Sequence, residues 1–67
     1  MINKADLDEI LQYQLPDFLR EGIEYVVEHP NDDCGLTQLN VYINSAEIDH
    51  GISPSICNRI RRDVLYA

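Results

Sequence analysis

Start and stop signals for helices divide this 67-residue chain into four short segments. Side-chain oxygens of asparagine, serine and threonine accept hydrogen bonds from the free amides of a first helical turn, and proline suits the first helical position. Such residues open each segment: Asn3, Pro16, Thr37 and the pair Ser53-Pro54. The stop signals are Leu15, which precedes a proline, then His29-Pro30, and Gly51, which is placed for a left-handed turn. These signals predict helices over residues 4–14, 16–29, 37–49 and 54–65.

Each segment carries apolar residues at three- and four-residue spacing, which is the period of a helix with one buried face. The predicted buried stripes are Leu7, Ile10 and Leu11; Phe18, Leu19, Ile23, Val26 and Val27; Leu39, Tyr42, Ile43 and Ala46; and Ile56 or Cys57 with Ile60 and Val64. Residues 40–43 also tolerate a β-strand, which stays open as an alternative. Residues 31–35 have the composition of a loop. The chain is therefore predicted to be all-α, a small bundle of four short helices in one domain, 1–67.

A chain of this length buries only about 60% of the surface that its unfolded form exposes, so its stability depends on good packing or on oligomerisation. Val41 and Ile48 lie off the buried stripe of their helix, and with Tyr42 they predict apolar surface at a homo-oligomer interface. The tyrosines that can join such an interface are Tyr13, Tyr25 and Tyr66. The sequence has no secretory pattern and no run of about 20 apolar residues, so we expect a cytoplasmic protein without membrane contact.

The formal net charge of −7 is unevenly distributed. Residues 1–33 hold nine of the twelve acidic residues and two of the five basic ones, whereas residues 34–67 hold three of each. Carboxylates recur at three- and four-residue spacing along the second predicted helix, opposite its apolar stripe, and two more follow in the next loop. This predicted protein-binding surface consists of Asp17, Glu21, Glu24, Glu28, Asp32 and Asp33. It is either a solvated helix face or a docking surface for a basic patch on a partner protein.

Residues 51–65 combine a turn glycine, a capped helix start and the three arginines 59, 61 and 62, which we expect to form the one cationic patch. The run Gly51-Ile52-Ser53-Pro54-Ser55, followed by Ile56, Ile60 and Arg61-Arg62, resembles the turn and recognition helix of bacterial helix-turn-helix regulators. The resemblance implies DNA contacts in the major groove from Ser55, Asn58, Arg59 and Arg62. Glu47 stands where the family has a small residue, and His50 where it has a large apolar one. The alternative is a plain amphipathic helix whose arginines pair with acidic residues.

The histidines and cysteines do not have the spacing of a metal site. Structural zinc sites need closely paired ligands, and such pairs are lacking among His29, Cys34, His50 and Cys57. We expect both cysteines to be small buried apolar residues. The chain also lacks a phosphate-binding glycine loop, and a domain this small has little room for the pocket that acid–base catalysis requires. No metal, no cofactor and no enzymatic activity are therefore expected.

The sequence leads to two functional hypotheses. The first is a small non-enzymatic regulatory or inhibitory protein, comparable in composition to phage or mobile-element modulators and toxin immunity proteins, which binds a basic partner protein through its acidic surface. The second is a minimal, dimeric helix-turn-helix DNA-binding regulator that uses the helix over 54–65. The position of Arg59 and Arg62 separates them. Outward-pointing arginines on a protruding helix favour DNA binding, and arginines folded back onto Asp17, Glu21 or Glu24 favour protein binding or a structural role.

Overall fold

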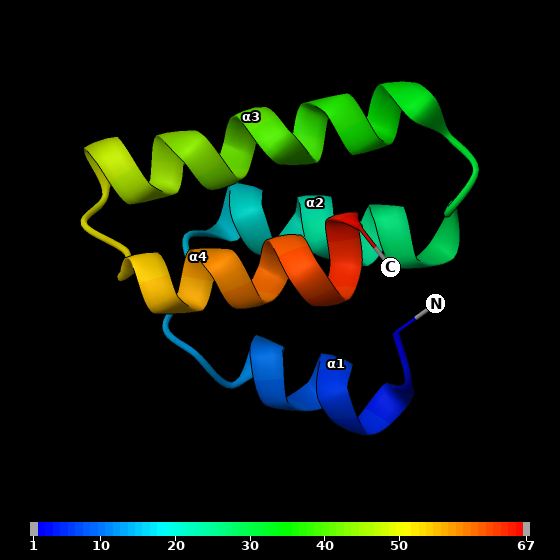
Figure 1. Ribbon diagram of the computed structural model, residues 1–67, viewed down its shortest axis with the longest axis horizontal. Helices are drawn as coiled ribbons and strands as arrows, with labels where there is room; N and C mark the ends of the chain where they lie inside the picture. Colours follow the sequence, from blue (N-terminus) through cyan, green and yellow to red (C-terminus); the bar gives the residue numbers. More distant parts are fainter. Residues whose placement is uncertain (1, 67) are drawn as a thin grey trace.

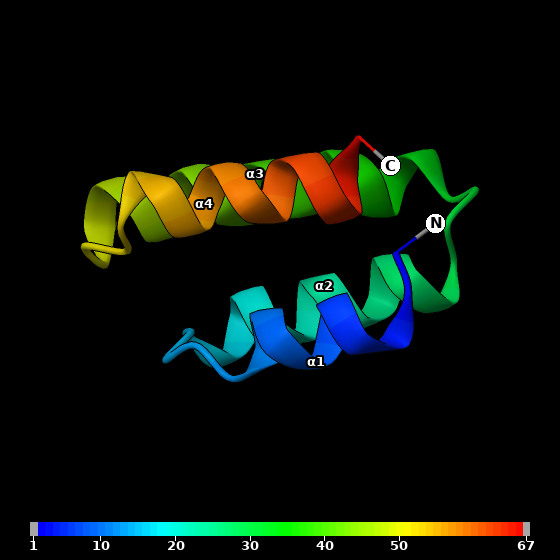
Figure 2. The same ribbon diagram turned by 60° about the horizontal axis from the view of Figure 1, so that its bottom comes forward.

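The computed structural model describes residues 2–66 and confirms the all-α prediction. Its elements are α1 (Lys4–Leu11), α2 (Asp17–Glu28), α3 (Asp33–Asp49) and α4 (Pro54–Ile60), which continues into the π-helical turn η1 (Arg61–Leu65). Figure 1 shows α4 between α1 and α3. Figure 2 shows two layers, with α3 and α4 in one and α1 and α2 in the other. The strand considered for residues 40–43 is wrong, because these residues lie inside α3.

The predicted apolar stripes meet in the interior of the bundle. The largest fully buried side chains are Ile10 of α1, Leu19 and Ile23 of α2, Leu39 and Ile43 of α3, and Cys57 and Ile60 of α4. Burying one large aliphatic side chain contributes about 1.5–3 kcal/mol. Helices of this length are marginal when isolated. The shared core therefore explains why they are stable together.

The first helix ends earlier than predicted, at Leu11 instead of near Gln14. Arg20 of α2 accounts for this difference. Its guanidinium donates hydrogen bonds to the carbonyl oxygens of Leu11, at 2.8 Å, and Tyr13, at 3.3 Å. In a longer helix the Leu11 carbonyl would accept from an amide four residues later. The arginine satisfies that carbonyl instead and fixes the turn between α1 and α2.

The third helix begins earlier than predicted, at Asp33 instead of near Thr37. The carboxylate of Asp32 accepts a hydrogen bond from the Gly35 amide at 3.1 Å, so it satisfies one of the free amides of the first turn. Residues 33–36 are therefore helical and not part of a loop. The predicted cap Thr37 lies inside α3, so that prediction is wrong, whereas the predicted caps Asn3 and Ser53 are confirmed.

The turn between α3 and α4 forms around Gly51, whose φ of +67° is the left-handed conformation predicted for it. The Ile52 amide donates to the Ala46 carbonyl at 3.1 Å and closes the end of α3. Ala46 is fully buried, whereas Glu47 is half-buried and pairs with Arg61. A small residue thus lies inside the bundle at this end of α3, one position before the place where the helix-turn-helix pattern has it.

Candidate functional site

The outer face of α2 is a line of exposed carboxylates. Asp17, Glu21, Glu24 and Glu28 are exposed, and Asp33 is exposed at the start of α3. The buried residues of α2 lie on its other side. Within residues 2–66 none of these five carboxylates takes part in an ion pair. We call the five residues the acidic face.

The one basic residue of α2 does not neutralise the acidic face. Arg20 is half-buried, and its guanidinium is held by the backbone carbonyls of Leu11 and Tyr13. It therefore points to the α1–α2 turn. The acidic face keeps its negative charge because the nearest cation along the chain already has other partners.

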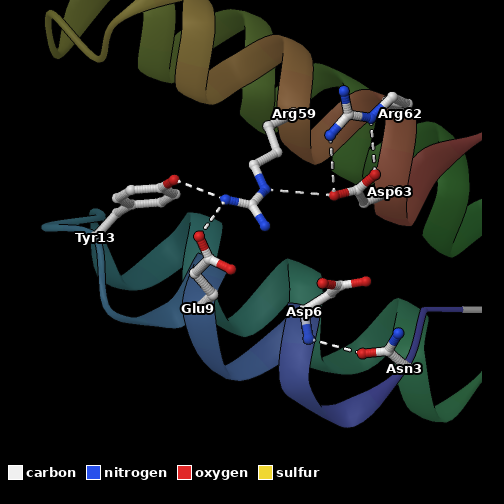
Figure 3. A network of polar contacts seen from close by, with 7 residues as sticks. All are labelled: Asn3, Asp6, Glu9, Tyr13, Arg59, Arg62 and Asp63. Atoms are coloured by element: carbon white, nitrogen blue, oxygen red, sulfur yellow. Dashed lines mark hydrogen bonds and ion pairs between the residues drawn. The ribbon is translucent and has the colours of Figure 1, made fainter.

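Arg59 joins α4 to α1 through a network of polar contacts (Figure 3). It donates hydrogen bonds to the Glu9 carboxylate at 2.8 Å, to the Tyr13 hydroxyl at 3.0 Å and to Asp63 at 3.4 Å. Only 22% of its side chain is exposed. The hydrogen bond from Arg59 lowers the pKa of the Glu9 carboxyl below its ordinary value. Arg59 and Asp63 stand four residues apart, which is the spacing of an ion pair along one helix, whereas Glu9 and Tyr13 lie far away in the sequence.

The remaining two arginines of this region also face carboxylates. Arg61 donates to Glu47 at 3.2 Å and to the side-chain oxygens of two asparagines, Asn44 and Asn58. Arg62 is 73% exposed and donates to Asp63 at 2.9 Å (Figure 3). The hydrogen bond from Arg62 is the main cause of the lowered pKa of the Asp63 carboxyl. The prediction of one separate cationic patch is therefore wrong, because every arginine of residues 59–62 is matched by a nearby acid from α1, α3 or η1.

The four residues predicted to contact DNA do not share one free face. Ser55, Asn58 and Arg62 are exposed along the outer side of α4 and η1, at helical spacing. Arg59 is turned toward α1 instead. Figures 1 and 2 show α4 running alongside α3 in the same layer, and η1, which continues it, also contacts α2. The arginines are not folded back onto Asp17, Glu21 or Glu24, but they do pair with other acidic residues, which is the arrangement expected of a plain amphipathic helix.

Asp32, the sixth residue of the predicted protein-binding surface, has a different role from the acidic face. Besides capping α3, its carboxylate accepts a hydrogen bond from the Tyr25 hydroxyl. That bond lowers the pKa of Asp32 and raises the pKa of Tyr25. The Tyr25 ring also stacks on His29, with 4.4 Å between the ring centroids. Asp32 is charged but partnered, and it fixes the corner between α2 and α3.

A groove of about 420 Å³ lies between α2 and α3, beside the acidic face. Its apolar lining comes from both helices: Phe18, Gly22 and Tyr25 of α2, and Gly35, Leu39 and Tyr42 of α3. Its polar lining is Glu21, Asp32, Cys34 and Gln38. The groove falls within the size range of about 300–1,000 Å³ that is usual for ligand sites. Glu21 belongs both to the groove and to the acidic face, so the two features form one continuous surface.

Two glycines face tyrosine rings across this groove. A Cβ atom on Gly22 would lie 2.9 Å from the Tyr42 ring, and one on Gly35 would lie 2.7 Å from the Tyr25 ring. Each helix therefore contributes a glycine that makes room for a tyrosine of the other. The groove was not predicted from the sequence. Gly22 in the middle of a predicted helix was the feature that pointed to it, because glycine there costs about 0.5–1 kcal/mol relative to alanine. Such a residue suggests a close contact with another part of the molecule.

The cysteines and histidines are dispersed over the molecule. Cys57 is buried as predicted, and burial raises the pKa of its thiol. The prediction that Cys34 is buried is wrong, since it is exposed beside the groove. His50 packs on the Phe18 ring with 5.1 Å between ring centroids. Within residues 2–66 no three or more histidine, cysteine, aspartate or glutamate side chains are grouped so that they could hold a metal ion.

The outer side of α3 exposes the two apolar residues that the sequence analysis assigned to an oligomer interface. Val41 is 53% exposed and Ile48 is 80% exposed. Tyr42 is half-buried instead, because its ring packs edge-to-face on Phe18. Of the tyrosines assigned to that interface, Tyr25 and Tyr66 are exposed and Tyr13 is half-buried. The homo-oligomer stays a prediction.

No protein family, curated protein or solved structure matches this chain. None of the helices within residues 2–66 has the length and apolar character needed to span a membrane.

Proposed function

We propose that this chain is a small non-enzymatic regulatory or inhibitory protein that binds a partner protein, with its acidic face against a basic patch of that partner. One observation carries this proposal. The arginines at positions 20, 59, 61 and 62 all have hydrogen-bond partners within this chain, including the exposed Arg62, whereas the five carboxylates of the acidic face have no ion pair among residues 2–66.

The charge arrangement favours a basic partner. The chain carries a formal net charge of −7 and its longest dimension is 28 Å. At physiological salt the screening length is about 8 Å, so an approaching molecule responds mainly to the face nearest to it. Near α2 that face presents only carboxylates. Such a potential raises association rates with cationic surfaces by about 10- to 1,000-fold and repels nucleic acid.

DNA binding by α4 has less support. The helix-turn-helix resemblance needs Arg59 at the DNA surface, but Arg59 is 22% exposed and is bound to Glu9 and Tyr13. The exposed cation on that side is Arg62, which contacts Asp63. A titration with genomic DNA fragments at about 0.05 M salt separates the two functions, because phosphate contacts strengthen as salt falls. Tight binding that is lost in Arg62→Ala would replace the proposed function by DNA binding.

Affinity capture with matched variants tests the proposed function. Wild type, Glu24→Gln/Glu28→Gln and the control Asp8→Asn/Asp49→Asn are each used as bait in lysate of the source organism. Both double variants remove two carboxylates from exposed positions, so their net charge is identical. We expect a stoichiometric partner with wild type and control that is lost with the α2 variant and released at about 1 M salt, where the screening length is about 3 Å. Equal capture by all three baits, or no partner at all, would contradict the proposal.

A further inference from the structure

We infer that the α2–α3 groove is the anchoring pocket of the partner site, and that its occupant is a basic amphipathic segment of the partner protein. The segment would place a large apolar side chain in the groove and its lysines or arginines against the acidic face. This inference rests on the proposed function and adds to it the chemistry of the recognised segment.

The apolar content of the groove argues for an apolar anchor. Phe18, Tyr25 and Tyr42 line it with partly exposed rings, and its volume of about 420 Å³ is open to solvent on a molecule of only 67 residues. An amphipathic helix binds such grooves by inserting apolar residues at positions i, i+3 or i+4. A partner bound only through charges would not require a groove. The groove therefore indicates that the recognised segment has an apolar side as well as a basic one.

The paired glycines support a recognition surface that is formed before binding. Gly22 lies inside α2, where glycine lowers helix stability compared with alanine, and Gly22 and Gly35 each leave room for a tyrosine ring. Tyr25 is held further by its hydrogen bond to Asp32 and by stacking on His29. Rigid tyrosines are frequent at protein-binding sites because they offer large contact area with little loss of conformational entropy.

The charge of the surroundings selects a basic segment as the occupant. Glu21 lines the groove itself, and Asp17 and Glu24 lie three or four residues from it along the same face of α2. A second copy of this chain would bring its own excess of carboxylates to this rim. Like charges that face each other without counter-charges oppose association. A cationic partner gains from the same carboxylates, so it fits this groove better than a second copy does.

Three synthetic peptides of equal length test the inference with the intact protein. The first is a basic amphipathic peptide with arginines on one side and leucines at i, i+3, i+4 and i+7. In the second peptide serines replace the leucines, and in the third glutamines replace the arginines. We expect the first peptide to bind most tightly. The serine peptide should bind at least about tenfold more weakly, since one buried leucine alone contributes that much. The glutamine peptide should also bind about tenfold more weakly, because it lacks the charges that face the carboxylates.

The three glycines of the chain locate the binding site in amide NMR spectra. Gly22 and Gly35 line the groove, and Gly51 lies in the α3–α4 turn with nothing within 4 Å of its Cβ position. The first peptide should shift the Gly22 and Gly35 signals and leave Gly51 unchanged. The variant Gln38→Lys adds a cation inside the groove, and Asn40→Lys adds one at an exposed position of α3 outside it. We expect the first variant to weaken binding about tenfold and the second to change it less than threefold.

Each other result would overturn the inference. Equal binding of the serine peptide without shifts at Gly22 and Gly35 would remove the groove but leave the acidic face as a purely electrostatic site. Equal binding of the glutamine peptide would contradict a basic occupant and the proposed function together. Shifts of Gly22 and Gly35 that depend on protein concentration without peptide would assign the groove to a second copy. If no peptide binds while affinity capture yields a salt-sensitive partner, only the groove assignment fails.

Discussion

Charged side chains are paired on the arginine-rich side of the molecule and unpaired on the outer face of α2. Around α4 and η1, each arginine is matched by a carboxylate, and Arg59 reaches across to Glu9 on α1. On α2, exposed carboxylates follow one another without a cation, although Arg20 lies among them in the sequence. The first arrangement uses charge to join helices. The second leaves charge at the surface.

This difference matters because 67 residues offer few ways to stabilise a fold. A domain of this size has a free energy of unfolding of roughly 3–10 kcal/mol. Like charges three or four residues apart on a helix reduce that stability slightly. Glu21, Glu24 and Glu28 therefore do not stabilise the fold, whereas Asp17 and Asp33 stand at helix starts, where the helix dipole favours a negative charge. The arginine side therefore belongs to the architecture, and the acidic face is the better candidate for contact with another molecule.

The largest predicted effect lies in the core beneath the arginine side. Ile60 of α4 is fully buried, whereas Ile48 of α3 is 80% exposed. Ile60→Ala should lower the free energy of unfolding by about 2–5 kcal/mol, and the milder Ile60→Val by about 0.5–1.5 kcal/mol. Ile48→Ala, the same change at the surface, should stay within about 0.5 kcal/mol. Urea unfolding followed by circular dichroism measures all three. A small effect of Ile60→Ala would mean that α4 is not packed as described.

The next effect compares two arginines of the same region. Arg59→Ala removes contacts with Glu9, Tyr13 and Asp63, so it should shift the urea midpoint clearly downward. Arg62→Ala removes an exposed contact with a single acid, and exposed ion pairs contribute little. Equal shifts for the two variants would show that the Arg59 network does not hold α1 against α4. Such a result would bring Arg59 closer to the free surface residue that DNA binding requires.

Local signals predicted most of the fold. The caps at Asn3 and Ser53 and the left-handed Gly51 depend on neighbouring residues in the chain, and all three are confirmed. The errors at the ends of α1 and α3 have a different origin. Arg20 binds carbonyls seven and nine residues away. Residues 31–35 were predicted to be a loop, but Asp32 among them caps α3. The error arose because the same residue types favour turns and helix starts.

The functional surface could be predicted only in part. The line of carboxylates on α2 follows from helical spacing and is present as exposed residues. Two partners of Arg59, Glu9 on α1 and Tyr13 in the turn after it, are 50 and 46 residues distant, and no local pattern points to them. The groove depends on two glycine–tyrosine contacts between α2 and α3, which become visible only when the helices are packed. Long-range contacts of this kind determine which charges are paired, and the sequence does not show them. The sequence alone therefore predicted that all three arginines form one free patch.

A pH titration should detect the charge pairing on the arginine side. The pKa of Glu9 in the folded protein is lowered, mainly by the hydrogen bond from Arg59, from an ordinary value of 4.5. Its contribution to stability is therefore complete above that value and is lost as the pH falls through the folded pKa. Glu9→Gln should be less stable than wild type at pH 7, and this difference should vanish in acid. The control is Asp8→Asn, since Asp8 makes no ion pair within residues 2–66. A Glu9→Gln difference that does not change with pH would contradict the pairing.

The smallest effect lies within the acidic face itself. Asp17 is the first residue of α2 and Glu28 is the last, and both are exposed. The helix dipole favours a negative charge at the start of a helix and opposes one at its end, each by about 0.3–1 kcal/mol. Asp17→Asn should therefore lower the free energy of unfolding and Glu28→Gln should raise it, although both remove one charge from the same face. Urea unfolding at low salt measures the two changes. An increase for both variants would mean that overall charge repulsion dominates, and a decrease for Glu28→Gln would contradict the dipole argument. The expected opposite signs would show that Glu28 lowers the stability of the fold.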